Sequence, residues 1–170
     1  MPHWPQTNLI PRDPSRGDDF PTACFFGDAA NLGPRLADPE WQRELKERTG
    51  VEFVVRTQLH WHDYHDIDAV VAVRDFRGGR QLHKPATKLF NAWLAGVPFV
   101  GGPDSAFSAE GHPGTDYLVA RSPEEVTEHL LRLAGDPGLR RRLVEAGRLR
   151  APEFTQEAAT RRWENLVLHE

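Results

Sequence analysis

Short apolar runs alternate with amphipathic stretches along this chain, and this alternation constrains the fold more than any other feature. Residues 23–27 form an apolar run closed by a glycine, and residues 51–56 are rich in β-branched and aromatic side chains. Residues 68–74 have an unbroken apolar centre, which is typical of a strand buried on both faces. Together with residues 97–102 and 116–120, these runs predict five strands.

The segments between the strands carry helix-capping signals. Asp38 is followed by a proline and an acid, so a helix is expected over residues 39–49, with Gly50 as its stop. A second helix is expected to hold Pro85 in its first turn and to end at Gly96. The polar loop after the fourth strand is expected to open another helix.

Three more helices are expected in the C-terminal part of the chain. Ser122 and Glu125 are three residues apart and predict a capping box. A further helix opens at Asp136 and has Gly147 near its end. The last, at about residues 155–168, is expected to bury Trp163, Leu166 and Val167.

Strands that alternate with helices of about 10 to 12 residues predict a parallel sheet covered on both faces. Right-handed crossovers then favour an α/β, Rossmann-like doubly wound sheet. The 170 residues suit a single domain. Residues 1–21 hold five prolines and are expected to form an extended arm or interdomain linker, followed by the Rossmann-like domain at residues 22–170.

Composition removes several classes of protein. The net charge of −4 does not provide the broad basic surface that nucleic-acid binding needs. Cys24 is the single cysteine, so no internal disulfide is possible and a reducing compartment is favoured. No run of about 18 apolar residues predicts a membrane span, and the N-terminal segment lacks the apolar core of a signal peptide. We therefore expect a cytoplasmic location.

Ligands of open parallel sheets bind at the carboxyl ends of the strands, which directs attention to three loops. Gly27 follows the first strand and would let a ligand approach the backbone. Arg74 ends the third strand on the same side. Ser105 and Ala106 follow the fourth strand, although the glycines there are equally suited to a plain strand-to-helix turn.

Lys84 and Lys88 are the strongest candidates for binding an anion. They are four residues apart and are expected to share one face of the helix that follows. Cations in a first helical turn oppose the helix dipole, and the free N–H groups there favour a phosphate that would compensate for them. The alternative is that both lysines are solvated surface residues.

Residues 60–68 contain three histidines and three aspartates, which raises a second possibility. Imidazole and carboxylate suit zinc or iron. The segment is similar to the H-x-H-x-D-H pattern of metallo-β-lactamase-like hydrolases, but Asp63 stands one place early. The alternative is a polar loop between two strands. Motifs of serine hydrolases, Walker A proteins and dinucleotide-binding proteins are absent, and Cys24 is expected to be an inert core thiol.

The order of motifs from residue 68 to residue 147 resembles a known family. A buried strand ending in arginine is followed by KP-x-x-KLFNAWLAGVPFVGG, then by G-x-DYLV, S-P-E-E-V and D-P-x-LR-x-x-L. This is similar to the C-terminal, nucleotide-sugar-binding domain of GT-B glycosyltransferases. The resemblance covers most of residues 22–168, and residues 88–102 carry most of its specificity.

The resemblance implies roles for individual residues. Lys84 and Lys88 would face the donor diphosphate, and Asn91 would lie near the ribose or the phosphates. The loop at residues 105–106 would contact the donor, and Gly27 would let the diphosphate approach. Where retaining members carry a pair of glutamates spaced E-x7-E, this chain has His83 and Asn91.

GT-B enzymes need a second Rossmann-like domain, and a chain of this length is not expected to contain one. The leading hypothesis is a glycosyltransferase-like domain that binds a nucleotide-diphosphate sugar and becomes an enzyme only with a missing N-terminal domain, a partner chain or a second copy. One alternative is a non-catalytic binding or assembly module. Another is a metal-dependent hydrolase built on residues 60–68. No cofactor is expected under the leading hypothesis.

Overall fold

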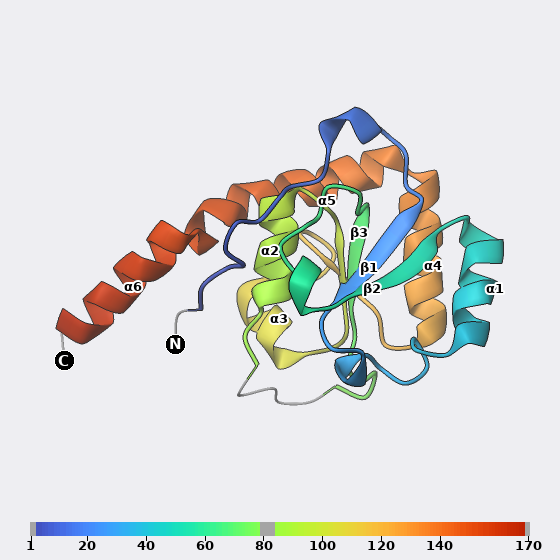
Figure 1. The fold of residues 1–170 in the computed structure, drawn as a ribbon, viewed down its shortest axis with the longest axis horizontal. Helices are drawn as coiled ribbons and strands as arrows, with labels where there is room; N and C mark the ends of the chain where they lie inside the picture. Colours follow the sequence, from blue (N-terminus) through green and yellow to red (C-terminus); the bar gives the residue numbers. More distant parts are fainter. Residues whose placement is uncertain (1–2, 79–83, 169–170) are drawn as a thin grey trace.

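A five-stranded parallel sheet forms the centre of the computed structural model, which describes residues 3–78 and 84–168 (Figure 1). The strand order within this described part is β2-β1-β3-β4-β5, and every neighbouring pair is parallel. The strands are β1 (Thr22–Phe26), β2 (Glu52–Arg56), β3 (Ala69–Ala72), β4 (Phe99–Gly101) and β5 (Leu118–Val119). The predicted α/β, Rossmann-like fold is confirmed.

Six α-helices accompany the strands in the described residues. They are α1 (Pro39–Thr49), α2 (Thr87–Ala95), α3 (Ser105–Glu110), α4 (Pro123–Gly135), α5 (Pro137–Arg150) and α6 (Gln156–Leu168). The bounds of α1 are as predicted, because the Asp38 carboxylate accepts the Glu40 N–H at 2.9 Å and Gly50 adopts φ +72° as the C-cap. The Ser122 hydroxyl likewise caps α4 by accepting the Glu125 N–H.

Two apolar layers cover the faces of the sheet. Strand alternation sends Ala23 and Phe25 to the face covered by α1 and α4, and Cys24 and Phe26 to the face covered by α2 and α3 (Figure 1). Both layers are continuous buried clusters. The helix α5 crosses the end of the sheet and contacts both α2 and α4.

The start of α2 differs from the prediction. The helix begins at Thr87, with Ala86 as an N-cap that makes no side-chain hydrogen bond, so Pro85 lies outside the first turn. Neither Lys84 nor Ala86 has a side-chain oxygen to cap a helix, and burial of Ala86 and Leu89 fixes the start instead. Lys84 therefore precedes the helix, and the prediction that Lys84 and Lys88 share a helix face is wrong.

The last helix also differs from the prediction. It was expected to bury Trp163, Leu166 and Val167, but Leu166 is 46% exposed and Val167 is 71% exposed. Figure 1 shows α6 extending away from the sheet. The apolar positions of α6 beyond its first turns have little to pack against in the described part of the chain, apart from Trp4, whose ring stacks on Trp163 at a centroid distance of 5.6 Å.

The N-terminal arm is held along the domain rather than projecting from it. The Ile10 N–H donates to the His62 carbonyl at 2.7 Å, and the Tyr64 N–H returns to the Ile10 carbonyl. Arg12 and Arg16 both pair with the buried Asp68 carboxylate. The arm contains one short 3-10 turn, Pro14–Arg16, and its role as an interdomain linker stays a prediction.

A membrane span would require a long apolar helix. No helix within residues 3–78 and 84–168 has that length and apolarity.

Candidate functional site

A pocket of about 270 Å³ opens at the carboxyl ends of β1 and β3. It brings together five of the seven residues that the sequence singled out. These are Gly27, Arg74, Lys84, Lys88 and Asn91, and the remaining lining is Gln6, Phe26, Asp28, Asn31, Trp61 and Thr87. We call this cavity the carboxyl-end pocket.

Gly27 ends β1 at the floor of the carboxyl-end pocket and adopts φ +157°. Its N–H donates to the Arg56 carbonyl at 2.9 Å, which fixes the turn. A Cβ added here would lie 3.0 Å from the Phe25 ring and 3.5 Å from the Lys88 Cε. The position therefore suits glycine, and the bare backbone leaves room for a ligand beside Lys88.

Lys88 lies in the first turn of α2 and is largely buried, with Nζ 5.4 Å from the centroid of the Phe25 ring. Burial, together with repulsion from Arg74 and Lys84, lowers the pKa of Lys88 to about 8, although Asp104 partly opposes the shift. No carboxylate of the described residues lies within ion-pair distance of its ammonium group. The pocket therefore has a positive charge that the protein itself leaves uncompensated.

Arg74 and Lys84 add to this charge from two other segments. Arg74 follows β3, and its guanidinium lies 3.9 Å from the Asp104 carboxylate, a loose ion pair that leaves most of its donors open. Lys84 is exposed at the rim. Although Lys84 does not share a helix face with Lys88, the fold still places both beside the same pocket.

Asn91 lies one turn further along α2 and is 5% exposed. Its side-chain oxygen accepts the Gln6 N–H at 2.9 Å, so the N-terminal arm forms part of the wall. Asn91 thus lines the carboxyl-end pocket, and its place near the ribose or the phosphates of a donor stays a prediction. His83, the other residue of the E-x7-E comparison, lies outside the described residues.

Ser105 and Ala106 are not brought to the carboxyl-end pocket. They begin α3, and neither belongs to the pocket lining. The Ala106 N–H donates to the Asp104 carboxylate at 2.8 Å, and this hydrogen bond caps the N-terminus of α3. A donor contact from these two residues stays a prediction that the pocket geometry does not support.

Gln6 and Trp61 are pocket residues that the sequence reasoning missed. Gln6 belongs to the arm, and no local pattern indicates that the arm folds back over α2. Trp61 lies in the loop after β2, with its indole N–H bonded to the Arg56 carbonyl at 3.0 Å. That loop follows a strand carboxyl end, and this signal could have identified Trp61.

The histidine and aspartate residues at 60–68 do not converge on one point. The Asp63 carboxylate bonds to the His65 ring at 2.8 Å, and Asp66 pairs with Arg56. Asp68 is buried beneath Arg12 and Arg16. Across the part of the chain that the structure describes, no three histidine, cysteine or carboxylate side chains are grouped as metal ligands would be. The segment is a polar loop, and the metal-dependent hydrolase has no support in its geometry.

The fold and the carboxyl-end pocket define a Rossmann-like domain with a cationic site at the edge of its sheet. The family described as "Glycosyl transferase-like" matches residues 23–167, and the chain belongs to this family. The resemblance noted in the sequence is thereby confirmed at the level of family and fold. No curated protein matches the chain.

Solved structures extend the comparison of folds. The apo form of the lipopolysaccharide outer core galactosyltransferase WaaB superposes with a TM-score of 0.60 at 11% identity, over 99% of this chain and 54% of that chain. The crystal structure of TarM superposes with a TM-score of 0.57 at 13% identity, over 98% of this chain and 37% of that chain. The chain thus spans about half of the first structure and less of the second, and it has the fold of one half of a GT-B protein.

Proposed function

We propose that the carboxyl-end pocket binds the diphosphate of a nucleotide-sugar donor. The observation that carries the proposal is the uncompensated Lys88 ammonium beside the bare backbone of Gly27, with Arg74 and Lys84 close by. Family membership and the galactosyltransferase among its structural relatives support the same class of ligand. The lining holds three cations and one carboxylate, that of Asp28, and a diphosphate would balance the excess positive charge.

Binding would proceed through charge compensation. The diphosphate would raise the pKa of Lys88 back toward its ordinary value, because an anion favours the charged ammonium form. Arg74 would contribute a planar set of donors, and Gly27 would allow close approach. In a complete enzyme the same cations would stabilise the nucleoside diphosphate as it leaves the sugar.

Turnover would require a second domain, a partner chain or another copy of this chain. The chain spans 54% of the galactosyltransferase on which it superposes, so nearly half of that protein lies outside the superposed part. The exposed apolar residues Leu166, Val167 and Leu168 on α6 would suit a contact with the missing part. A cytoplasmic location belongs to the same proposal, and the single buried thiol of Cys24 fits a reducing compartment.

Calorimetric titration with UDP, GDP and ADP sugars tests donor binding. The Lys84→Ala/Lys88→Ala double variant is expected to lose at least about 30-fold in affinity, because two charged contacts to phosphate are removed. Lys46→Ala is the matched control, since Lys46 is an exposed lysine on α1 that pairs with the exposed Glu52. Absence of binding by the wild-type protein, or equal binding by the double variant, would remove the site.

The second candidate is a non-catalytic assembly module, which the exposed end of α6 favours. Light scattering during size-exclusion chromatography distinguishes the two. A stable oligomer without donor affinity, which reverts to monomer on Leu166→Ser/Val167→Ser substitution, would support assembly. A monomer that binds donor would support the first proposal alone.

A further inference from the structure

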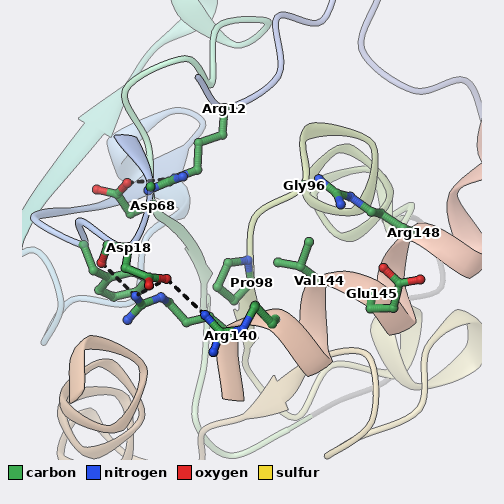
Figure 2. A pocket seen from close by; sticks show the side chains of 12 residues that line it. Arg12, Asp18, Asp68, Gly96, Pro98, Arg140, Val144, Glu145 and Arg148 are labelled. Carbon is green, nitrogen blue, oxygen red and sulfur yellow. Dashed lines mark hydrogen bonds and ion pairs between the residues drawn. The ribbon is translucent and has the colours of Figure 1, made fainter. Parts of the chain in front are cut away.

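A second cavity among the described residues lies at the opposite end of the sheet. It measures about 440 Å³ and opens at the amino ends of β3 and β4, next to Asp68 and Pro98 (Figure 2). The N-terminal arm forms one wall, and α5 forms the other. Its size falls within the range of about 300–1,000 Å³ that is usual for small-molecule sites. We call it the amino-end cavity.

Fixed contacts hold the walls of the amino-end cavity in place. On the arm side, Arg12 donates to the buried Asp68 carboxylate at 2.9 Å and to the Asp19 carbonyl at 2.7 Å. On the α5 side, Arg140 is 8% exposed and donates to the Asp18 carbonyl at 2.7 Å. Since these contacts join segments far apart in the sequence, the cavity is preorganised rather than a gap between loops.

Positive charge exceeds negative charge around this cavity. Arg12 and Arg16 share the single carboxylate of Asp68. Arg140 and Arg141 share the single carboxylate of Asp18, each at 3.4 Å. Arg16 does not line the cavity and also interacts with Asp19 and Asp66. Among the lining residues four arginines face three carboxylates, an excess of one positive charge: Arg12, Arg140, Arg141 and Arg148 against Asp18, Asp68 and Glu145.

Arg148 completes the cationic lining. Within the described residues it makes no hydrogen bond or ion pair, and Figure 2 shows it reaching from α5 toward Gly96. A Cβ on Gly96 would come within 3.3 Å of its guanidinium, so the guanidinium lies directly beside the Gly96 backbone. Glu145 also lines the cavity, so the lining as a whole has a net positive charge of one.

Apolar groups cover the surface between these charges. Phe20, Pro98 and Val144 line the cavity, and the Phe20 ring lies 5.1 Å from the Arg140 guanidinium carbon. A bare inorganic ion would leave this apolar surface in contact with water. We propose that the amino-end cavity binds a small organic anion, a carboxylate or phosphate group attached to an apolar body. This site is separate from the proposed donor site and does not depend on it.

Phenyl phosphate and benzoate are suitable probes, with phenol and inorganic phosphate as matched compounds that lack the charge or the ring. Amide chemical shifts in a ¹H–¹⁵N titration report where each probe binds. At least one aromatic anion is expected to shift Gly96 and Val144, and to bind at least about tenfold more tightly than phenol or inorganic phosphate. Shifts centred on Gly27 and Lys88 instead would overturn the proposal.

Two variants test the charge and the shape of the amino-end cavity separately. Arg141→Gln/Arg148→Gln is expected to raise the Kd about tenfold or more, as expected for losing hydrogen bonds to a charged group. Arg132→Gln/Arg161→Gln removes the same charge elsewhere on the surface and is expected to change the Kd less than about twofold. Val144→Trp, which fills the cavity, is expected to abolish binding.

The outcomes separate this site from the donor site. Binding of the aromatic anions by the Lys84→Ala/Lys88→Ala variant is expected to equal that of the wild-type protein. Absence of binding by both aromatic anions, or an equal loss in the two arginine double variants, would show that the cavity is not an anion site. Neither result would alter the titrations with nucleotide sugars.

Discussion

The two ends of the sheet differ in how their buried charges are balanced. At the amino end, Asp68 accepts bonds from Arg12, from Arg16 and from the Thr22 N–H, so its carboxylate is fully engaged. At the carboxyl end, Lys88 is largely buried without a carboxylate partner, and two further cations repel it. The first arrangement stabilises the fold. The second costs stability, as expected for a site whose charge is compensated by a ligand.

The largest effect is expected at the amino end. Asp68→Asn removes the charge that Arg12 and Arg16 share and leaves these two cations without the buried carboxylate that pairs with both. The free energy of unfolding should fall by about 3–5 kcal/mol, the range for breaking a buried ion pair. Urea denaturation measures it, and Glu52→Gln, which breaks the exposed pair with Lys46, should cost less than about 1 kcal/mol. A small loss in Asp68→Asn would remove the contrast between the two ends.

Substitution at the carboxyl end should act in the opposite direction. Lys88→Met keeps the long apolar stem and removes the buried ammonium, so the free energy of unfolding at pH 7 should rise by about 1–3 kcal/mol. The same variant should lose donor binding. A destabilised Lys88→Met protein would show that the lysine stabilises the fold. The proposed difference between the two ends of the sheet would then be wrong.

The pH dependence of stability carries a defined sign. The pKa of Lys88 is about 8 in the folded protein and 10.5 for the unperturbed group, so the unfolded chain binds more protons between these values. The Lys88 contribution to stability should therefore rise with pH from about 8 to 10.5. Burial raises the pKa of Cys24 to about 12, which acts in the opposite direction above pH 9. The difference between the wild-type protein and Lys88→Met, measured by denaturation at several pH values, isolates the lysine.

Donor affinity should fall as the ammonium loses its proton. Without ligand, Lys88 is mostly protonated at pH 7 and mostly neutral at pH 9. Calorimetry at the two values should show a decrease of about tenfold or less, since the bound diphosphate raises the pKa and resists the loss. Arg74→Gln should weaken binding at both pH values alike, because a guanidinium keeps its proton throughout this range. A flat profile for the wild-type protein would exclude Lys88 as the titrating contact.

The smallest effect is expected far from both ends, on α6. Val167 is 71% exposed, so Val167→Ser should change the free energy of unfolding by less than about 0.5 kcal/mol. Leu143→Ala on the neighbouring α5 is the contrast, because Leu143 is 2% exposed and should cost about 2–5 kcal/mol. Thermal and urea denaturation measure both. A large loss for Val167→Ser would indicate that α6 packs on another surface in solution.

Local patterns were sufficient for most of the fold. The apolar runs located all five strands, and Asp38 and Gly50 gave both ends of α1, because caps and periodicity act over a few residues. They were insufficient where the decisive contact is distant in sequence. The start of α2 depends on packing of Ala86 and Leu89, and the exposure of α6 depends on the absence of a covering surface within the described residues.

The residues of the carboxyl-end pocket also divide into those that the sequence could identify and those that depend on contacts distant in sequence. Gly27 and Arg74 could be chosen from the sequence, because the carboxyl ends of parallel strands meet at one edge. Lys84 and Lys88 were chosen for a shared helix face that does not exist, yet the fold brings both to the carboxyl-end pocket. Gln6 could not be identified from the sequence, because the hydrogen bond from its backbone N–H to the Asn91 side chain joins residues 85 positions apart.

The sequence by itself determined the α/β class, the parallel sheet and the chemical types of side chain available at its carboxyl edge. Hydrophobic periodicity, caps and glycine stops act locally, so they can be recognised without the fold. Only the tertiary structure decided which charges are balanced. Asp68 meets Arg12 and Arg16 across more than 50 residues, whereas Lys88 meets no carboxylate among the described residues. Burial and pairing depend on three-dimensional proximity, and these two quantities distinguish a charge that stabilises the fold from one that the protein leaves unpaired.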